Sequence, residues 1–475
     1  MPVCTTCGEE SPEGFSFCGR CGARLVDAAA AREERKLVTV LYADIVGSTA
    51  RAETLDPEDV RAFLAPYHAR LRRELERFGG TVEKFIGDAV VAVFGAPAAH
   101  EDDPERAVRA ALAELNDADP ELQLEVRPSN HARLLFLRGE GDRGVALATE
   151  ALAVADAVGD LRVRSEALIT LGSARFATGE IEAGLETLER GVELAREHHP
   201  VAGLRGLNNL GSFFASLGRL DDARATRSEA LAGSERLGIP YFVRWMRVEL
   251  AFHDYWSGNW AQALDTAAAI LAQAEAGESH YMDVGAHWTH SAVALARGNL
   301  ELARQEADWC LAFGRDSGDP QNVLPLLGWH GRVLAETGDA AAAVAEAEEV
   351  LAARSRDAIE FWAPSVAAAL DLASRGEVFL AAAPPVGPLR TWWDAGAALA
   401  AGRHREAAER FHAIGSLPDE AWARLRAGRA LLAESARAEA AAEVERALAF
   451  WRSVGAARYV RDAEQLLGEG MRARR

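Results

Sequence analysis

Residues 298–303 read Gly-Asn-Leu-Glu-Leu-Ala, a glycine followed five positions later by a small residue, and this pair recurs along most of the chain. The glycines are spaced by 38, 39, 40, 40 and 40 residues, and they are Gly141, Gly179, Gly218, Gly258, Gly298 and Gly338. The small residues are Ala146, Gly184, Ala223, Ala263, Ala303 and Ala343. Seven positions before five of the glycines lie Gly172, Gly211, Ala251, Ser291 and Gly331. A period near forty predicts stacked helix pairs, with small residues where two helices cross and a turn between them.

This pattern resembles the tetratricopeptide repeat, with each helix pair lengthened by a few residues, over most of residues 131–475. Pro384-Pro385 interrupts the pattern, which returns at Gly402 and then fades. We therefore expect an all-α, tetratricopeptide-type solenoid over residues 128–475. Such solenoids bind protein or peptide partners far more often than they catalyse reactions, so we expect a partner of this kind. Another class of α-solenoid remains an alternative that would leave this function unchanged.

The aromatic residues of the repeats allow two interpretations. They could line a concave binding groove, or they could fill the interfaces between helices, which is the more frequent use of such residues and the one we favour. The tryptophans concerned are Trp245, Trp256, Trp260, Trp288 and Trp309. Cys310 lies alone in the same region, and we expect it to be a buried core thiol.

Four of the five cysteines lie in the first 21 residues, as the pairs Cys4-x-x-Cys7 and Cys18-x-x-Cys21. Two such pairs can complete a tetrahedral shell around Zn²⁺. A disulfide pair or a redox site is the alternative, but a chain without an export signal keeps its thiols reduced. We expect a structural zinc ribbon over residues 1–26, followed by a helical linker over residues 27–36.

A strand is predicted at Leu37–Ala43, where β-branched residues are frequent, and Asp44 follows it directly. Two further β-prone runs, Thr81–Ile86 and Ala89–Phe94, flank Gly87-Asp88 and predict a hairpin. Asp44 and Asp88 would then stand at strand ends, where a divalent metal and a phosphate could bind. The alternative is that both are ordinary turn aspartates, and that Lys84 is a solvated strand residue.

Three strings of this region resemble the first half of a class III nucleotide cyclase domain: VTVLYADIVGST, FGGTVEKFIGDAVVAVFGAP and AHEDDPERAVRAALA. The resemblance covers nearly all of residues 37–127 and implies a partial α/β, ferredoxin-like domain. It implies that Asp44, Asp88 and the Ile45 carbonyl bind two Mg²⁺ or Mn²⁺ ions, and that Lys84 recognises the adenine of ATP. It also implies that the backbone after Asp44 cradles phosphates, at Gly47, Ser48 and Thr49. Hard oxygen ligands suit these metals, which would activate the nucleophile and neutralise the leaving group.

The resemblance stops near Arg127. The family continues into a helix whose asparagine orients the ribose and whose arginine stabilises the transition state, whereas this chain turns to Pro128-Ser129-Asn130 and then to the repeats. In the family, one domain supplies the metal aspartates and its partner supplies the asparagine and arginine. A homodimer of this chain could not supply them, so we expect no cyclic nucleotide synthesis by the chain alone.

The bulk composition excludes several classes of protein. A net charge of −20 argues against nonspecific nucleic-acid binding. Neither Lys36 nor Lys84 stands in a G-x-x-x-x-G-K-[ST] loop, so a P-loop ATPase is absent. The start of the sequence lacks a basic stretch followed by an apolar one, so we expect no secretory signal, and no apolar run is long enough to span a membrane. We therefore expect a cytoplasmic protein.

Three functional hypotheses follow. The first is a regulatory or interaction protein that acts through its repeats, with a vestigial or weakly nucleotide-binding half-site. The second is a half-enzyme that converts ATP to cyclic AMP and pyrophosphate when paired with a complete cyclase chain. The third is a deletion remnant without function.

Overall fold

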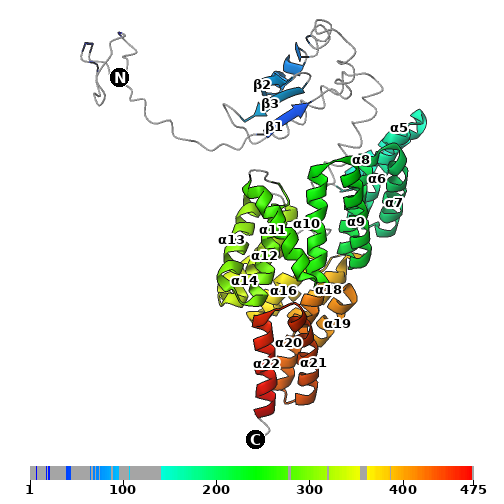
Figure 1. The fold of residues 1–475 in the computed structure, drawn as a ribbon. Helices are drawn as coiled ribbons and strands as arrows, with labels where there is room; N and C mark the ends of the chain where they lie inside the picture. The colour runs from blue at the N-terminus through cyan, green and yellow to red at the C-terminus, as the bar shows by residue number, and fades with distance from the viewer. Residues whose placement is uncertain are drawn as a thin grey trace. The chain divides into compact units, whose positions relative to one another are not determined.

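The computed structural model divides into two compact units, Met1–Arg127 and Pro128–Arg475 (Figure 1). The described residues are Cys7, Cys18, Arg20 and Cys21 and the ranges 39–43, 65, 68–69, 71–73, 75–86, 89–95, 106, 141–276, 280–317, 320–353, 361–385 and 387–472.

The first unit contains a three-stranded antiparallel sheet in the order β1-β3-β2. Its strands are β1 (Thr39–Ala43), β2 (Thr81–Ile86) and β3 (Ala89–Phe94). The hairpin predicted around residues 87–88 is therefore confirmed, and its strands are joined by the pair Ile86–Ala89. The register of β2 shifts between Val82 and Lys84, which leaves one extra residue in that strand.

A helix covers one face of this sheet. Leu71 and Leu75, four residues apart on one helical face, pack against Val90, Ala92 and Phe94, which alternate along β3. The helix ends at the glycine pair Gly79-Gly80. Gly79 has a φ of +89°, and a β-carbon on Gly80 would lie 2.5 Å from the Phe94 ring. Glycine is required at both positions, because a β-carbon would disfavour the positive φ of Gly79 and would clash with Phe94 at Gly80.

The second unit is helical. Its helices are α5 (Gly141–Val158), α6 (Leu161–Ala177), α7 (Ile181–His198), α8 (Pro200–Ser216), α9 (Leu220–Leu237), α10 (Pro240–Trp256), α11 (Trp260–Glu275), α12 (Asp283–Arg297), α13 (Leu300–Ser317), α14 (Pro320–Thr337), α15 (Ala340–Ala353), α16 (Ala363–Leu372), α17 (Gly376–Ala381), α18 (Thr391–Ala400), α19 (His404–Ile414), α20 (Leu417–Ala433), α21 (Arg437–Ser453) and α22 (Ala457–Arg472), with a short 3₁₀ helix at Gly387–Arg390. Among these, none is both long and apolar enough to cross a membrane.

The predicted repeat is confirmed in its main features. The glycines at the turns between paired helices all have φ between +75° and +101°, and they are Gly179, Gly218, Gly258, Gly298 and Gly338. The small residues lie where the helices cross. A β-carbon on Gly172 of α6 would lie 2.4 Å from the backbone nitrogen of Leu188 in α7. Small residues are required at these positions because the backbones of the two crossing helices are in contact.

Two details depart from the predicted pattern. Gly141 is the first residue of α5, and the turn that precedes α6 is instead at Gly159, with a φ of +76°. Helix pairs also continue where the glycine pattern fades. Ser374 and Ser435 take positive φ between α16 and α17 and between α20 and α21, so serine replaces the glycine by which the repeat was recognised.

The later helices pack against the turns of the earlier ones. A β-carbon on Gly218 would lie 2.8 Å from Thr391 Cγ2, and one on Gly258 would lie 3.0 Å from Phe450 Cε2. Trp392 Nε1 donates a hydrogen bond of 2.7 Å to the Ala215 carbonyl. Figure 1 shows these later helices, in orange and red, against the lower ends of the green helices. The repeats therefore fold back on themselves, and glycine at these turns allows the close approach.

A buried polar cluster joins the two sets of repeats. Glu336 of α14 lies 3.3 Å from Arg332 Nε and 2.9 Å from Arg458 Nη1 of α22, and accepts a hydrogen bond of 2.7 Å from the Tyr459 hydroxyl. Arg332 also lies 3.1 Å from Asp419 of α20. Because these side chains have little access to solvent, each charge depends on its partners for compensation.

Candidate functional site

The cysteine cluster is the candidate metal site of the first unit. The sulfur atoms of Cys7, Cys18 and Cys21 all lie within 4.8 Å of one another, and those of Cys7 and Cys18 are 3.6 Å apart. A tetrahedral zinc site with Zn–S bonds of about 2.3 Å requires sulfur atoms about 3.8 Å apart, so these three thiols fit the ion. Cys4, the fourth predicted ligand, lies outside the described residues.

Backbone amides further favour a thiolate in this cluster. Hydrogen bonds from the backbone of Cys21 and of Arg20 lower the pKa of the Cys18 thiol, and Arg20 N lies 3.4 Å from Cys18 Sγ. A thiolate is the form that binds zinc, so the local backbone is suited to the predicted role. Cys310, in contrast, is buried in α13, and burial raises the pKa of its thiol. The expectation of a structural role for Cys310 agrees with this environment.

Only part of the predicted nucleotide half-site lies within the described residues. Lys84 is an exposed residue of β2. Asp44, Ile45, Gly47, Ser48, Thr49 and Asp88 lie outside the described residues. The strand residues next to the two aspartates are described. The pairs Ala43–Val90 and Ile86–Ala89 place these residues at the same end of the three strands. The sheet register is thus compatible with a shared metal site, whose oxygen ligands would suit Mg²⁺ or Mn²⁺.

Most of the repeat tryptophans pack between helices. Trp260 is buried, and its Nε1 donates a hydrogen bond of 2.9 Å to the Tyr255 carbonyl. Trp256 lies 5.8 Å from Trp392, between ring centroids, across the contact between early and late repeats. Trp309 is the exception, since 41% of it is exposed. The preferred interpretation therefore holds for most of these residues and not for Trp309.

Trp309 ends a line of aromatic rings that we call the aromatic strip, and its members are Tyr241, Trp245, Tyr281, Phe313 and Trp309. Successive ring centroids along it are 5.8, 5.6, 6.2 and 5.6 Å apart. Tyr241, at the other end, is 50% exposed. The strip joins the first turns of α10, the residues before α12 and the last turns of α13. Its two end members are exposed, and the three rings between them are partly buried.

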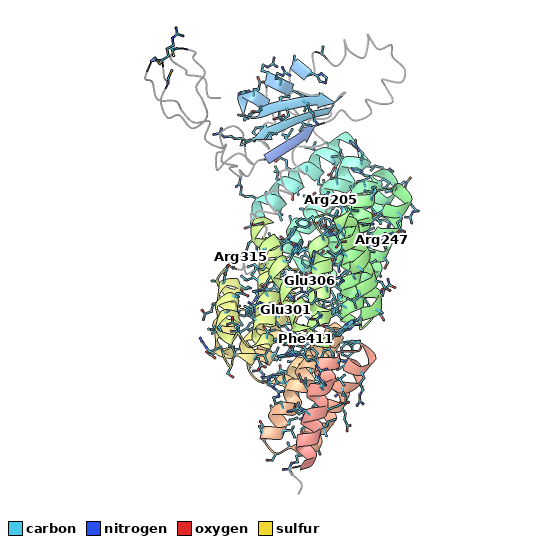
Figure 2. The ribbon with its side chains drawn as sticks, turned by 60° about the vertical axis from the view of Figure 1, so that its left-hand side comes forward. Arg205, Arg247, Glu301, Glu306, Arg315 and Phe411 are labelled. Carbon is cyan, nitrogen blue, oxygen red and sulfur yellow. The ribbon has the colours of Figure 1, made fainter. Side chains whose placement is uncertain are left out.

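Histidine–carboxylate pairs border the aromatic strip. Glu306 Oε2 lies 2.5 Å from His287 Nδ1, and the His287 ring stacks on Trp309 at 3.7 Å. Burial opposes ionisation of Glu306, but hydrogen bonds from His287 and His290 lower its pKa to about 2. Figure 2 labels Glu301, Glu306 and Arg315 along α13, the helix that carries this carboxylate. The border of the strip is therefore charged and hydrogen-bonded.

Comparison with known proteins identifies the first unit. Residues 30–132 match the adenylate and guanylate cyclase catalytic domain. An uncharacterized protein of Mycobacterium tuberculosis (strain H37Rv) is 40% identical over 114 residues, covering 22% of this chain and 21% of the relative. An adenylate cyclase of Anabaena cylindrica is 34% identical over 73 residues, covering 15% of this chain and 14% of the relative. The chain thus aligns with about a fifth or less of the length of these relatives.

Two solved structures match most of the length of this chain, with low sequence identity. A Rap protein complexed with competence and sporulation factor covers 74% of this chain and 99% of its own, with 12% identity and a TM-score of 0.40. Yeast Tom70 covers 76% of this chain and 92% of its own, with 13% identity and a TM-score of 0.25. The family match over residues 30–132 and the paired helices of the second unit together describe a cyclase-related protein with C-terminal helical repeats.

The aromatic strip was not predicted from the sequence. Its members lie far apart in the chain, at the ends of three helices, and they do not share one repeat position. The tryptophans singled out in the sequence include Trp245 and Trp309. They do not include Tyr281 and Phe313, which connect these two, or Tyr241 at the other end. The only sequence signal available was the concentration of aromatic residues between residues 241 and 313.

Proposed function

We propose that this protein acts by binding a protein partner through its repeats, and that its cyclase-related unit does not make cyclic nucleotide alone. The aromatic strip carries the first part of the proposal. Tyrosine and tryptophan with an apolar body and a polar tip are enriched in protein interfaces, where a few such residues supply most of the binding energy. The charged border formed by Glu306 and its histidines would act as the polar rim of such an interface.

The strip is tested by a double substitution, Tyr241→Ala with Trp309→Ala. Both side chains are substantially exposed, so the fold should tolerate the change. Val201→Ala is the matched control, because Val201 is an exposed apolar residue of α8 that is no member of the strip. We expect the same partner to be recovered with the native chain and with the control. In the double variant, the free energy of binding of this partner should weaken by about 2 kcal/mol or more. Equal recovery with all three chains would contradict this role of the strip.

The alternative is a half-enzyme, and the register of the sheet is compatible with it. The strand ends next to Asp44 and Asp88 are brought together, as a metal pair requires, and Lys84 is accessible on β2. In this proposal the chain gives these residues to a hybrid site, and a complete cyclase chain gives the asparagine and arginine. The bound metals would activate the 3′ oxygen of ATP and stabilise the leaving pyrophosphate.

One assay separates these proposals. The purified chain is incubated with ATP and Mn²⁺, alone and with a complete cyclase relative that has been inactivated at its own metal aspartates. Turnover by the chain alone would contradict the first proposal. Turnover only in the mixture, lost on substitution of Asp44 in this chain, would support the half-enzyme. A chain that does not fold would support the deletion remnant.

We also propose that Cys4, Cys7, Cys18 and Cys21 bind one structural Zn²⁺. The fit of the three described sulfur atoms to a tetrahedral site supports this proposal, together with the backbone hydrogen bonds to Cys18. Metal analysis of freshly purified protein should give close to one zinc per chain.

A further inference from the structure

Two successive helices, α9 and α10, carry buried polar residues where the equivalent helices of the neighbouring repeats carry apolar ones. His253, Asp254 and Arg227 are all buried. At the His253 position, the repeat before and the two after have Phe213, Val293 and Val333. At the Asp254 position they have Phe214, Ala294 and Leu334, and at the Arg227 position Leu188, Ala267 and Ala307, all of them buried. Burial of polar groups costs free energy, and such local departures from a fold's pattern occur chiefly at functional sites.

The polar residues form a connected network. Arg227 lies 2.6 Å from Glu249 Oε2 and 2.5 Å from the Nε2 atom of His253, and Arg224 lies 2.9 Å from Asp254 Oδ1. A guanidinium group only donates, so His253 Nε2 accepts and the ring carries its proton on Nδ1. Burial, and then the charges of Arg227 and Arg224, lower the pKa of His253 to about 2. The His253 side chain is therefore neutral at ordinary pH and is held in place by its hydrogen bond to Arg227.

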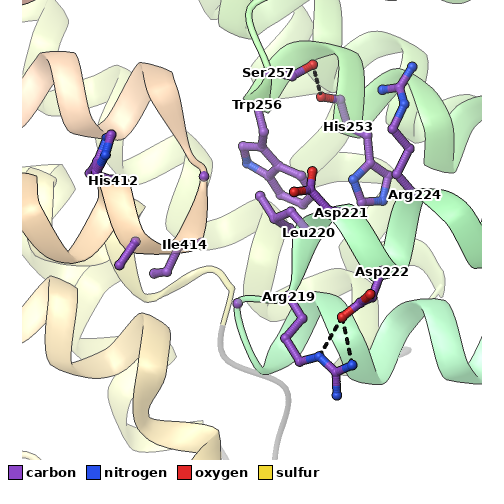
Figure 3. A pocket seen from close by; sticks show the side chains of 13 residues that line it. Arg219, Leu220, Asp221, Asp222, Arg224, His253, Trp256, Ser257, His412 and Ile414 are labelled. Atoms are coloured by element: carbon purple, nitrogen blue, oxygen red, sulfur yellow. Dashed lines mark hydrogen bonds and ion pairs between the residues drawn. The ribbon is translucent and has the colours of Figure 1, made fainter.

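This network borders a cavity of ≈ 520 Å³. Its walls are the start of α9, the end of α10 and the end of α19, so it lies between the early and the late repeats (Figure 3). The volume is within the range of about 300–1,000 Å³ that is typical of sites for small ligands. Trp256, Leu220 and Ile414 give the cavity apolar walls beside the polar ones.

The charges that line the cavity leave one carboxylate over. Arg219 is paired with Asp222 at 2.7 Å, and Arg224 is paired with Asp254. Asp221 makes no hydrogen bond or ion pair of its own with the part of the chain that the structure describes. Asp221, Trp256 and His253 all line this cavity, and Figure 3 labels the three side chains. A carboxylate and an indole that line the same cavity each attract a cation, the first through its charge and the second through the quadrupole of its ring.

We propose that this cavity binds an organic cation, a primary ammonium group on an apolar chain. The ammonium group lies at Asp221 and Trp256, and the apolar chain lies against Leu220 and Ile414. A free amine and the lysine side chain of another protein share this chemistry. Because the walls come from both early and late repeats, the bound cation joins them and stabilises their packing. The proposal does not depend on the aromatic strip, which is formed by other residues.

Calorimetry on the full chain tests the proposal with three ligands of equal chain length: n-hexylamine, 1-hexanol and hexanoate. We expect hexylamine to bind and to raise the melting temperature, and the neutral and anionic ligands to bind at least about tenfold more weakly. N-acetyl-lysine amide distinguishes the source, since tighter binding than hexylamine indicates a protein side chain and weaker binding a free amine.

Asp221→Asn is the decisive variant, because Asp221 is exposed and its replacement keeps the fold. We expect its affinity for hexylamine to fall by about tenfold or more. Glu301→Gln is the matched control, since Glu301 has the same repeat position in the first turn of α13 and lines no part of this cavity. Full affinity in Asp221→Asn, equal binding of the three ligands, or no binding of either amine at millimolar concentration would overturn the proposal.

Discussion

Glu336→Gln tests whether the buried cluster holds the late repeats against the early ones. The side chain of Glu336 is only 3% exposed, and its carboxylate faces Arg332, Arg458 and the Tyr459 hydroxyl. The amide keeps the shape but removes the negative charge. Asp419 still compensates Arg332, but Arg458 loses the only carboxylate that lies within ion-pair distance of it among the described residues. Removal of one partner from a buried ion pair costs about 3–5 kcal/mol.

Urea unfolding followed by tryptophan fluorescence measures this loss, because Trp422 and Trp451 lie in the late repeats. Glu349→Gln is the control, since Glu349 forms an exposed pair with Arg315 at 3.2 Å and such pairs contribute about 0–1 kcal/mol. The double variant Glu336→Gln with Arg458→Gln should lose less than the sum of the single losses, since neither charge is then left alone. Equal losses for Glu336→Gln and Glu349→Gln would show that the cluster does not join the repeats.

The remaining predictions concern packing, pH and metal. Gly172→Ala should destabilise the chain by about 1–3 kcal/mol in urea unfolding, because the new β-carbon would lie 2.4 Å from a backbone atom of α7. Gly203→Ala should instead stabilise α8 by up to about 1 kcal/mol, because its nearest contact would be an ordinary one of 3.4 Å. Burial disfavours protonation of His330, but hydrogen bonds to Glu346 and Asp308 raise its pKa, so its contribution to stability should be full below pH ~6.5 and disappear as the pH rises through the higher folded-state pKa. His330→Gln should flatten this dependence in melting curves recorded against pH. Cys18→Ser should lower the zinc content measured by metal analysis well below one per chain, and an unchanged content would exclude Cys18 as a ligand.

The sequence predicted those parts of the fold that depend on local geometry. Gly179 to Gly338 could be recognised because a left-handed turn between helices requires glycine at a fixed period. The hairpin at residues 81–94 could be recognised because its β-prone runs flank a turn pair. Ser374 and Ser435 satisfy the same backbone requirement with a less diagnostic residue, so the later helix pairs did not show in the pattern.

The return of the late repeats onto the early ones could not be predicted from the sequence. It depends on contacts between residues 87 to 177 positions apart, such as Arg332 with Asp419 and Trp392 with Ala215. No period marks these contacts, and each residue taken alone is a plausible surface arginine, aspartate or core tryptophan.

The polar positions in the repeat of α9 and α10 could have been found by comparing the repeats with one another. Aligning the turn glycines places His253 against Phe213 and Val293, and no requirement of a helix crossing explains a histidine there. In a solenoid that does not fold back on itself, apolar residues at the position of His253 would be enough for the packing between helices. Here the end of α19 lies against this part of the solenoid, so His253 lies beside a partly open cavity that α19 helps to form. The back-folding therefore explains how a cavity forms beside these polar residues.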